Sequence, residues 1–135
     1  LRMQSRVLIS SEVDWYGASK WVKKAAASKF PQCLHDLPVL LPTGHSRLRV
    51  DLNHWFEQLG IVPHVVGEFE DSALMSVFAA RGMGVFPVSR LGVYDTGTLS
   101  GLRLLGQCDD IHEEIYGVWN VQSIDHPLVV ELLNA

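Results

Sequence analysis

The alternation of apolar and polar positions predicts short strands and helices in regular succession. Residues 37–42 (LPVLLP) form a continuous apolar run bounded by prolines, which is typical of a strand buried on both faces. Apolar residues then recur at the period of a helix as far as Gly60, at Leu48, Leu52, Trp55, Phe56 and Leu59. This spacing predicts an amphipathic helix directly after the first buried strand.

The same order repeats further along the chain. Residues 61–69 predict a second strand, with Pro63 near its start or at a sheet edge. Residues 72–81 predict a second helix that Gly82 ends, with an inward face made by Leu74, Val77 and Phe78. The other expected elements are extended segments at 6–9 and 13–18, a connector or weak helix at 19–32, strands at 84–88, 102–106 and 114–121, a helical turn at 89–95, and a helix opened by Asp125. This alternation indicates an α/β fold with a mixed, mostly parallel sheet covered on both sides.

The composition is that of one compact domain. The chain has 135 residues, and its 19% of charged residues is below the ~25% usual in globular domains. We therefore expect a partner or further chain to cover part of the surface. The net charge of −4 argues against a basic face that grips nucleic acid.

The chain has no apolar run of membrane-spanning length and no recognisable secretion signal. We therefore expect a cytoplasmic protein with no membrane partner. In that compartment, Cys33 and Cys108 are expected to remain reduced thiols.

Three loops are expected at the carboxyl ends of the strands, where open α/β sheets bind ligands beside helix N-termini. They are residues 42–46 (PTGHS), 68–72 (EFEDS) and 85–89 (VFPVS). In the first loop, Gly44 would let a ligand approach the backbone, but Thr43 or Ser46 as a helix cap is explanation enough.

The second loop holds three acids within four residues, at Glu68, Glu70 and Asp71. Asp71 or Ser72 can cap the next helix, and the helix dipole favours Glu70. Glu68 then needs a separate explanation, because clustered carboxylates repel one another unless they are solvated or neutralised. The cluster is either a cap with a solvated surface or a site for sodium, protons or a cationic ligand.

The motifs of metal sites and enzymes are missing from the sequence. His45 and His54 fall on opposite faces of the predicted helix, and the chain has no HExxH or paired CxxC motif. The GxSxG elbow of hydrolases is also absent, and the Gly82–Gly84 segment precedes a strand rather than a helix. We expect no catalytic residue, metal or cofactor.

Three segments together resemble the effector-binding (substrate-binding) domain of LysR-type transcriptional regulators. They are LPVLLPTGHSRLR (37–49), WFEQLGIVPHVVGEFEDSALMSVFAARGMGVFPVS (55–89) and DHPLVVELL (125–133). Within the family, WFEQLG, GEFEDSALM and the closing HP helix look most like the activators of sodium/proton antiporter genes. The resemblance covers essentially the whole chain.

The resemblance implies a periplasmic-binding-protein-like (type II) architecture, in which two Rossmann-like lobes are joined by two crossing strands. In this chain, 20–112 would be a complete second lobe, and 13–19 and 113–121 the crossing strands. Residues 1–12 and 122–135 would be remnants of the first lobe. The helix-turn-helix domain and the rest of the first lobe are expected outside these 135 residues.

The resemblance also implies where an effector binds. The loop after the lobe's first strand matches Thr43, Gly44, His45 and Ser46. The start of the next helix matches Glu70, Asp71 and Ser72, next to the extra acid Glu68, and the short strand matches Val85, Phe86 and Pro87. Aromatic and glycine residues of the crossing strands would pack the hinge or line the cleft, namely Trp15, Tyr16, Gly17, Tyr116 and Trp119.

The expected function is effector sensing in a transcription activator, in response to Na⁺ or pH. The expected partners are a small molecule or cation, DNA through the helix-turn-helix domain, and further copies of the protein. The alternatives are a solute-binding protein of the same architecture and a small α/β enzyme.

Overall fold

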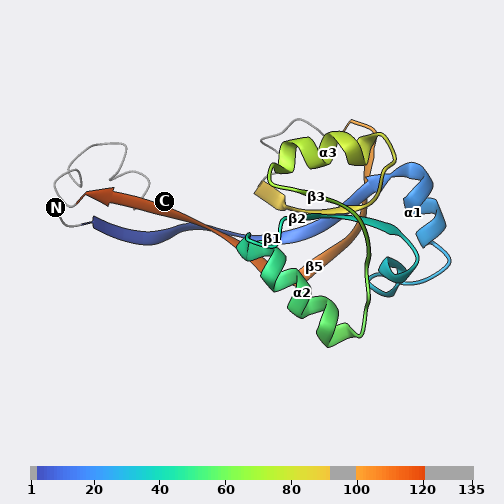
Figure 1. Cartoon of the computed structure of the whole chain (residues 1–135), viewed down its shortest axis with the longest axis horizontal. Coiled ribbons are helices and arrows are strands. Elements are labelled where there is room, and N and C mark those ends of the chain that lie inside the picture. Colours follow the sequence, from blue (N-terminus) through green and yellow to red (C-terminus); the bar gives the residue numbers. More distant parts are fainter. Residues whose placement is uncertain (1–2, 92–99, 121–135) are drawn as a thin grey trace.

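The computed structural model describes residues 3–91 and 100–120, and its helices and strands alternate as the sequence predicts (Figure 1). The predicted helix that opens at Asp125 and most of the predicted turn at 89–95 lie outside the described residues. The elements are β1 (Met3–Ala18), α1 (Ser19–Ala25), a 3₁₀ turn (Gln32–His35), β2 (Pro38–Pro42), α2 (Arg47–Leu59), β3 (His64–Phe69), α3 (Ser72–Ala80), β4 (Phe86–Ser89) and β5 (Leu102–Asn120).

The strands form a mixed sheet. β2 and β3 are parallel, and β1 lies between β4 and β5, antiparallel to both. A parallel bridge joins Val39 of β2 to Val85, and the Leu40 amide donates to the Val85 carbonyl at 2.8 Å. The strands therefore follow the order β3, β2, β4, β1, β5, and the predicted α/β class with a mixed sheet is confirmed.

Both faces of the sheet are buried, as the apolar run at β2 predicts. Successive side chains of a strand point to opposite faces, and Val39 and Leu41 pack in the core cluster that contains Leu52 of α2. Leu40 packs in a second cluster with Met75 of α3. Figure 1 accordingly shows α2 and α3 on opposite sides of the strands.

An aromatic group anchors α2 to β1. Trp15 is fully buried, and its ring stacks on Trp55 with centroids 6.2 Å apart and meets Phe56 edge-on at 5.9 Å. Aromatic pairs at such distances contribute about 0.5–1.5 kcal/mol beyond their burial. The packing fixes the helix whose first turn borders the cavity described below.

The predicted inward face of α3 is wrong. Met75 and Ala79 are buried, whereas Leu74, Val77 and Phe78 are 49%, 42% and 38% exposed. The helix is apolar around most of its circumference, so the pattern alone does not define a single buried side. The small side chain of Ala79 lets the helix approach the sheet, and the larger residues remain outside.

The expected crossing strands, 13–19 and 113–121, do not pair with each other in the structure. β1 and β5 are long continuous strands, and Val13–Ala18 pair with Leu102–Cys108, while Met3–Glu12 pair with His112–Asn120. The register shifts between Glu12 and Val13, because residues 109–111 have no partner on β1. Such extra residues form a bulge and bend the strand.

The bulge divides the β1–β5 pair into two parts. The inner ribbon, Val13–Ala18 with Leu102–Cys108, continues into β4 and the rest of the sheet. The outer ribbon, residues 3–12 with 112–120, runs away from the helices as a long two-stranded arm (Figure 1). Pairing depends on residues about a hundred positions apart, which is why local patterns do not give the register.

Candidate functional site

Two helices begin at the carboxyl ends of β2 and β3, and each has a side-chain cap. The amide of Arg49 donates to the Ser46 hydroxyl at 2.9 Å, and the amide of Ala73 donates to the Asp71 carboxylate at 2.8 Å. These are the caps of α2 and α3, as the sequence predicts. The helix N-termini therefore lie at one edge of the sheet.

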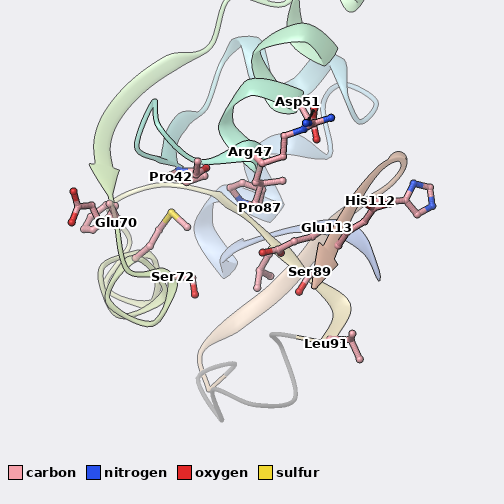
Figure 2. Close-up of a pocket in the computed structure, with 16 residues that line it drawn as sticks. Pro42, Arg47, Asp51, Glu70, Ser72, Pro87, Ser89, Leu91, His112 and Glu113 are labelled. Atoms are coloured by element: carbon pink, nitrogen blue, oxygen red, sulfur yellow. Dashed lines mark hydrogen bonds and ion pairs between the residues drawn. The ribbon is translucent and has the colours of Figure 1, made fainter. Parts of the chain in front are cut away.

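A cavity of about 770 Å³ opens at this edge (Figure 2). Its walls come from the ends of β2 and β3, the first turns of α2 and α3, β4 and the start of the outer ribbon. Figure 2 shows Arg47 near Asp51 on α2, with Glu70 and His112 on opposite sides of the view. The lining residues are Pro42, Ser46, Arg47, Leu48, Asp51, Phe69, Glu70, Ser72, Met75, Pro87, Val88, Ser89, Leu91, His112, Glu113 and Glu114.

The structure brings four of the expected effector residues together in the cavity wall: Ser46, Glu70, Ser72 and Pro87. They come from all three of the expected loops. The other expected residues lie outside this wall, namely Thr43, Gly44, His45, Glu68, Asp71, Val85 and Phe86.

Four of the residues outside the wall have other contacts. Glu68 pairs with Arg49, so this acid is already neutralised, and Asp71 caps α3. Val85 and Phe86 are buried in the two core clusters. Within the acid cluster, only Glu70 borders the cavity.

The contributions of α2 and β5 to the cavity wall were not predicted from the sequence. Arg47 and Asp51 are one helical turn apart, and the Arg47 Nε lies 3.3 Å from the Asp51 Oδ1. Their spacing was visible in the sequence, but it predicts only a surface pair. Residues 112–114 reach the cavity because the bulge precedes them, and no local signal predicts that placement.

The charged residues of the cavity wall are predominantly acidic. The wall contains four carboxylates (Asp51, Glu70, Glu113 and Glu114) and one guanidinium (Arg47), which is paired with Asp51. Hydroxyl groups of Ser46, Ser72 and Ser89 supply further oxygen atoms. A wall of this kind attracts positively charged groups.

The expected hinge residues of β1 lie in the core rather than in the cavity wall. Trp15 packs on α2, and Tyr16 packs against the α3 cluster. Gly17 lies so close to Val85 that a Cβ there would be 2.6 Å from the Val85 Cγ1. The backbones of Tyr116 and Trp119 belong to the outer ribbon, and their side chains lie outside the described part of the structure.

Both cysteines are free and buried. Burial raises the pKa of the Cys33 thiol and of the Cys108 thiol. Within residues 3–91 and 100–120, three or more potential ligands do not gather to hold a metal ion. The same residues contain no helix long and apolar enough to span a membrane.

Comparison with known sequences identifies the family. Residues 4–135 match the model of the LysR substrate binding domain. The transcriptional activator protein NhaR of Escherichia coli (strain K12) is 30% identical over 132 residues, which are 97% of this chain and 44% of NhaR. The chain thus spans less than half the length of this relative.

Solved structures share the fold at low sequence identity. The regulatory domain of CcmR from Synechocystis PCC6803, in complex with 2-PG, gives a TM-score of 0.73 at 15% identity over 99% of this chain and 65% of that chain. The effector binding domain of QuiR in complex with shikimate gives 0.71 at 14% identity, over 98% and 62% of the two chains.

The chain belongs to the LysR substrate-binding domain family. It is an effector-binding domain of a LysR-type regulator, with the periplasmic-binding-protein-like fold that the resemblance implies, and it is not an enzyme. Regulatory domains of this family bind small-molecule effectors, as the 2-PG and shikimate complexes illustrate. The alternatives of a solute-binding protein and a small enzyme are therefore set aside.

Proposed function

We propose that the cavity is the effector site of a transcription activator and that its effector is a cation, with Na⁺ as the first candidate. The observation that carries this proposal is the excess of carboxylates over guanidinium groups in a wall that also presents serine hydroxyls. Among the described residues these acids are spread around the wall and do not form a cluster of three ligands, so the proposal rests on the acidic lining as a whole. Hard cations prefer oxygen ligands of this kind. The resemblance to activators of sodium/proton antiporter genes supports sodium, or a change of pH, as the signal.

The described residues supply the sheet with its helices, which we take as one lobe, and the outer ribbon beyond it. We retain the division into a second lobe at 20–112 and first-lobe remnants at 1–12 and 122–135 as part of the proposal. An effector that contacts both α3 and residues 112–114 would favour one angle between lobe and ribbon over another, and so shift the equilibrium between them.

The wider setting is proposed from the family resemblance. The regulator would act in the cytoplasm as a homo-oligomer, and it would contact DNA through a helix-turn-helix domain outside residues 1–135. Effector binding would then change DNA binding through the relative positions of the subunits.

Sodium binding is tested by comparing NaCl with KCl at constant ionic strength. At a Na⁺ concentration about ten times the dissociation constant, binding stabilises the folded state by about 1.4 kcal/mol and raises the Tm by about 5 °C. Hydrogen exchange should slow at the starts of α2 and α3 and along β4. Equal Tm values and equal exchange in the two salts would rule out sodium as the effector.

Glu70→Gln removes one carboxylate from the cavity wall and should reduce the difference between the two salts. Glu57→Gln is the matched control, because Glu57 is exposed near the end of α2 and is not part of the wall. If both variants respond to sodium as the wild-type protein does, Glu70 has no part in cation binding.

A further inference from the structure

Arg90 follows the last residue of β4 and joins three strands through one guanidinium group. Its Nε lies 3.1 and 3.0 Å from the two carboxylate oxygens of Asp14, and its Nη1 lies 3.2 Å from Glu12. Its Nη2 lies 3.0 Å from the Asp109 carboxylate. We call these four residues the Arg90 hub.

The hub lies at the bulge that separates the inner and outer ribbons. Asp109 is the first of the three consecutive β5 residues, 109–111, that have no partner on β1 at the bulge. Glu12 is the last β1 residue of the outer ribbon, and Asp14 belongs to the inner ribbon. Arg90 therefore contacts both sides of the bend and the bulge itself.

The three acids differ in burial, which distinguishes charge compensation of Asp14 from the contacts at the bend. Asp14 is 3% exposed, so it needs a charged partner whatever else the hub does. Glu12 and Asp109 have side chains that are 40% and 76% exposed and need no partner for solvation. Their convergence on Arg90 is unexplained by burial, and both lie where the ribbon changes direction.

The electrostatics agree with this geometry. The hydrogen bond that Arg90 donates to Asp14, followed by the one that it donates to Asp109 and by the charges of Asp14 and Glu12, raises the pKa of Arg90. Three carboxylates around one guanidinium leave the hub with a net negative charge, so Arg90 remains charged and engaged at any physiological pH.

The hub is also flanked by the cavity wall on both sides. Ser89 and Leu91, the neighbours of Arg90, line the cavity, and so do His112 and Glu113, directly after the bulge. His112 Nε2 lies 4.0 Å from Glu12 Oε1. A group that filled the cavity would therefore touch the lobe side and the ribbon side of the same junction.

We infer that Arg90 is a positioning residue that fixes the angle of the outer ribbon to the lobe and carries a change in the cavity to the ribbon. The first part stands on the described contacts alone. The second part rests on the proposed function, because it requires an effector in the cavity.

The first part is tested by distance measurements between spin labels on the ribbon and the lobe. Ser5→Cys on the outer ribbon and Glu57→Cys on α2 place labels at exposed positions, while Cys33 and Cys108 are buried. The wild-type background should give one narrow distance distribution. Arg90→Gln should broaden it, and Arg90→Lys should restore it in part, because lysine keeps the charge but not the fork of donors.

Hydrogen exchange separates positioning from simple loss of stability. In Arg90→Gln, the amides of the outer ribbon should exchange about tenfold faster, with those of β2 and α2 unchanged. Arg81→Gln, at an exposed arginine after α3, is the matched control and should resemble the wild type. An unchanged distance distribution, or equal acceleration throughout the lobe, would overturn the inference.

A second variant keeps the test decisive if Arg90→Gln does not fold. Asp109→Asn removes only the most exposed acid and leaves the buried Asp14 with its partner. It should broaden the distribution of label distances, as Arg90→Gln does. A distribution like that of the wild type in a folded Asp109→Asn protein would contradict the role of the hub in fixing the ribbon.

Transmission is tested with NaCl against KCl as the probe. In the wild type, Na⁺ should shift the mean label distance and protect α3. In Arg90→Lys, the protection should remain and the shift should be lost. If Na⁺ protects α3 and shifts the distance equally in both proteins, the second part fails. If Na⁺ has no effect on either protein, the sodium proposal and the transmission built on it fail, while the broadening in Arg90→Gln still decides the first part.

Discussion

The guanidinium of Arg49 in α2 is paired with the carboxylate of Glu68 in β3. The same Nη1 donates to the Pro42 carbonyl at the end of β2 at 2.9 Å. One side chain therefore ties the first turn of α2 to two neighbouring strands at the edge of the sheet that borders the cavity. The Glu68 carboxylate is therefore already paired with a cationic side chain.

Glu68→Gln should lower the free energy of unfolding by about 0.5 kcal/mol, because its side chain is half exposed and surface pairs are weak. Arg49→Ala should cost more, about 1–2 kcal/mol, since the bond to Pro42 is lost as well. Urea denaturation measures both. The difference in Tm between NaCl and KCl should be unchanged in Glu68→Gln, and a loss of that difference would return Glu68 to the effector site.

Gly17 and Val85 pack so closely that a larger side chain at residue 17 should destabilise the protein. Gly17→Ala places a Cβ 2.6 Å from the Val85 Cγ1, and it should destabilise the protein by about 1–3 kcal/mol. Gly44→Ala is the control, because a Cβ there meets nothing within 4 Å. In a double-mutant cycle, Val85→Ala should relieve part of the Gly17→Ala cost. Strictly additive losses would show that the two residues are not in contact.

The orientation of α3 predicts losses of stability of different size at two neighbouring residues. Met75→Ala should cost about 2–4 kcal/mol, because it leaves a cavity between α3 and the sheet. Leu74→Ala should cost under about 1 kcal/mol, since Leu74 is half exposed. Chemical denaturation of the two variants checks this directly. The reverse order of stabilities would mean that the face first expected from the sequence is the buried one.

The buried thiols predict a dependence on pH. Burial, as the largest cause, raises the pKa of Cys33 and of Cys108 in the folded state. The unfolded chain therefore loses these protons first, so this stabilisation is complete below the unfolded thiol pKa and is lost as pH rises toward the folded values. The free energy of unfolding should fall above about pH 9. The fall should be shallower in a protein with Cys33→Ala and Cys108→Ala.

The same burial should protect both thiols from a disulfide reagent at pH 8. Labelling in native buffer should be slow and limited by local opening, and labelling in urea should be complete and rapid. Rapid reaction of either thiol in native buffer would show that its surroundings are open to solvent.

Features that depend on a few neighbouring residues were predictable from the sequence. Ser46 and Asp71 cap α2 and α3, and Gly60 ends α2 with a φ of 68°. In each case the residue type answers a requirement of the adjacent helix, either a side-chain acceptor or a left-handed backbone. The alternation of strands and helices follows from periodicity in the same way.

Features that depend on distant residues were not predictable. The Arg90 hub brings together residues 12, 14, 90 and 109, and their meeting depends on the register of β1 with β5. The cavity wall likewise owes residues 112–114 to the bulge. Four residues of the wall were expected, because strand ends and helix starts converge in this architecture. The place of residues 112–114 could be known only from the pairing of β1 with β5.

Met3 pairs with Asn120 across the far end of the β1–β5 ribbon. Paired antiparallel residues have Cα atoms only about 5 Å apart. The segment 3–120 therefore begins and ends at two neighbouring points. Residues 3–120 could be inserted into a surface turn of a carrier protein without separating the two ends of that turn. In a fluorescent carrier with this insertion, a change in the angle of the outer ribbon would change the fluorescence.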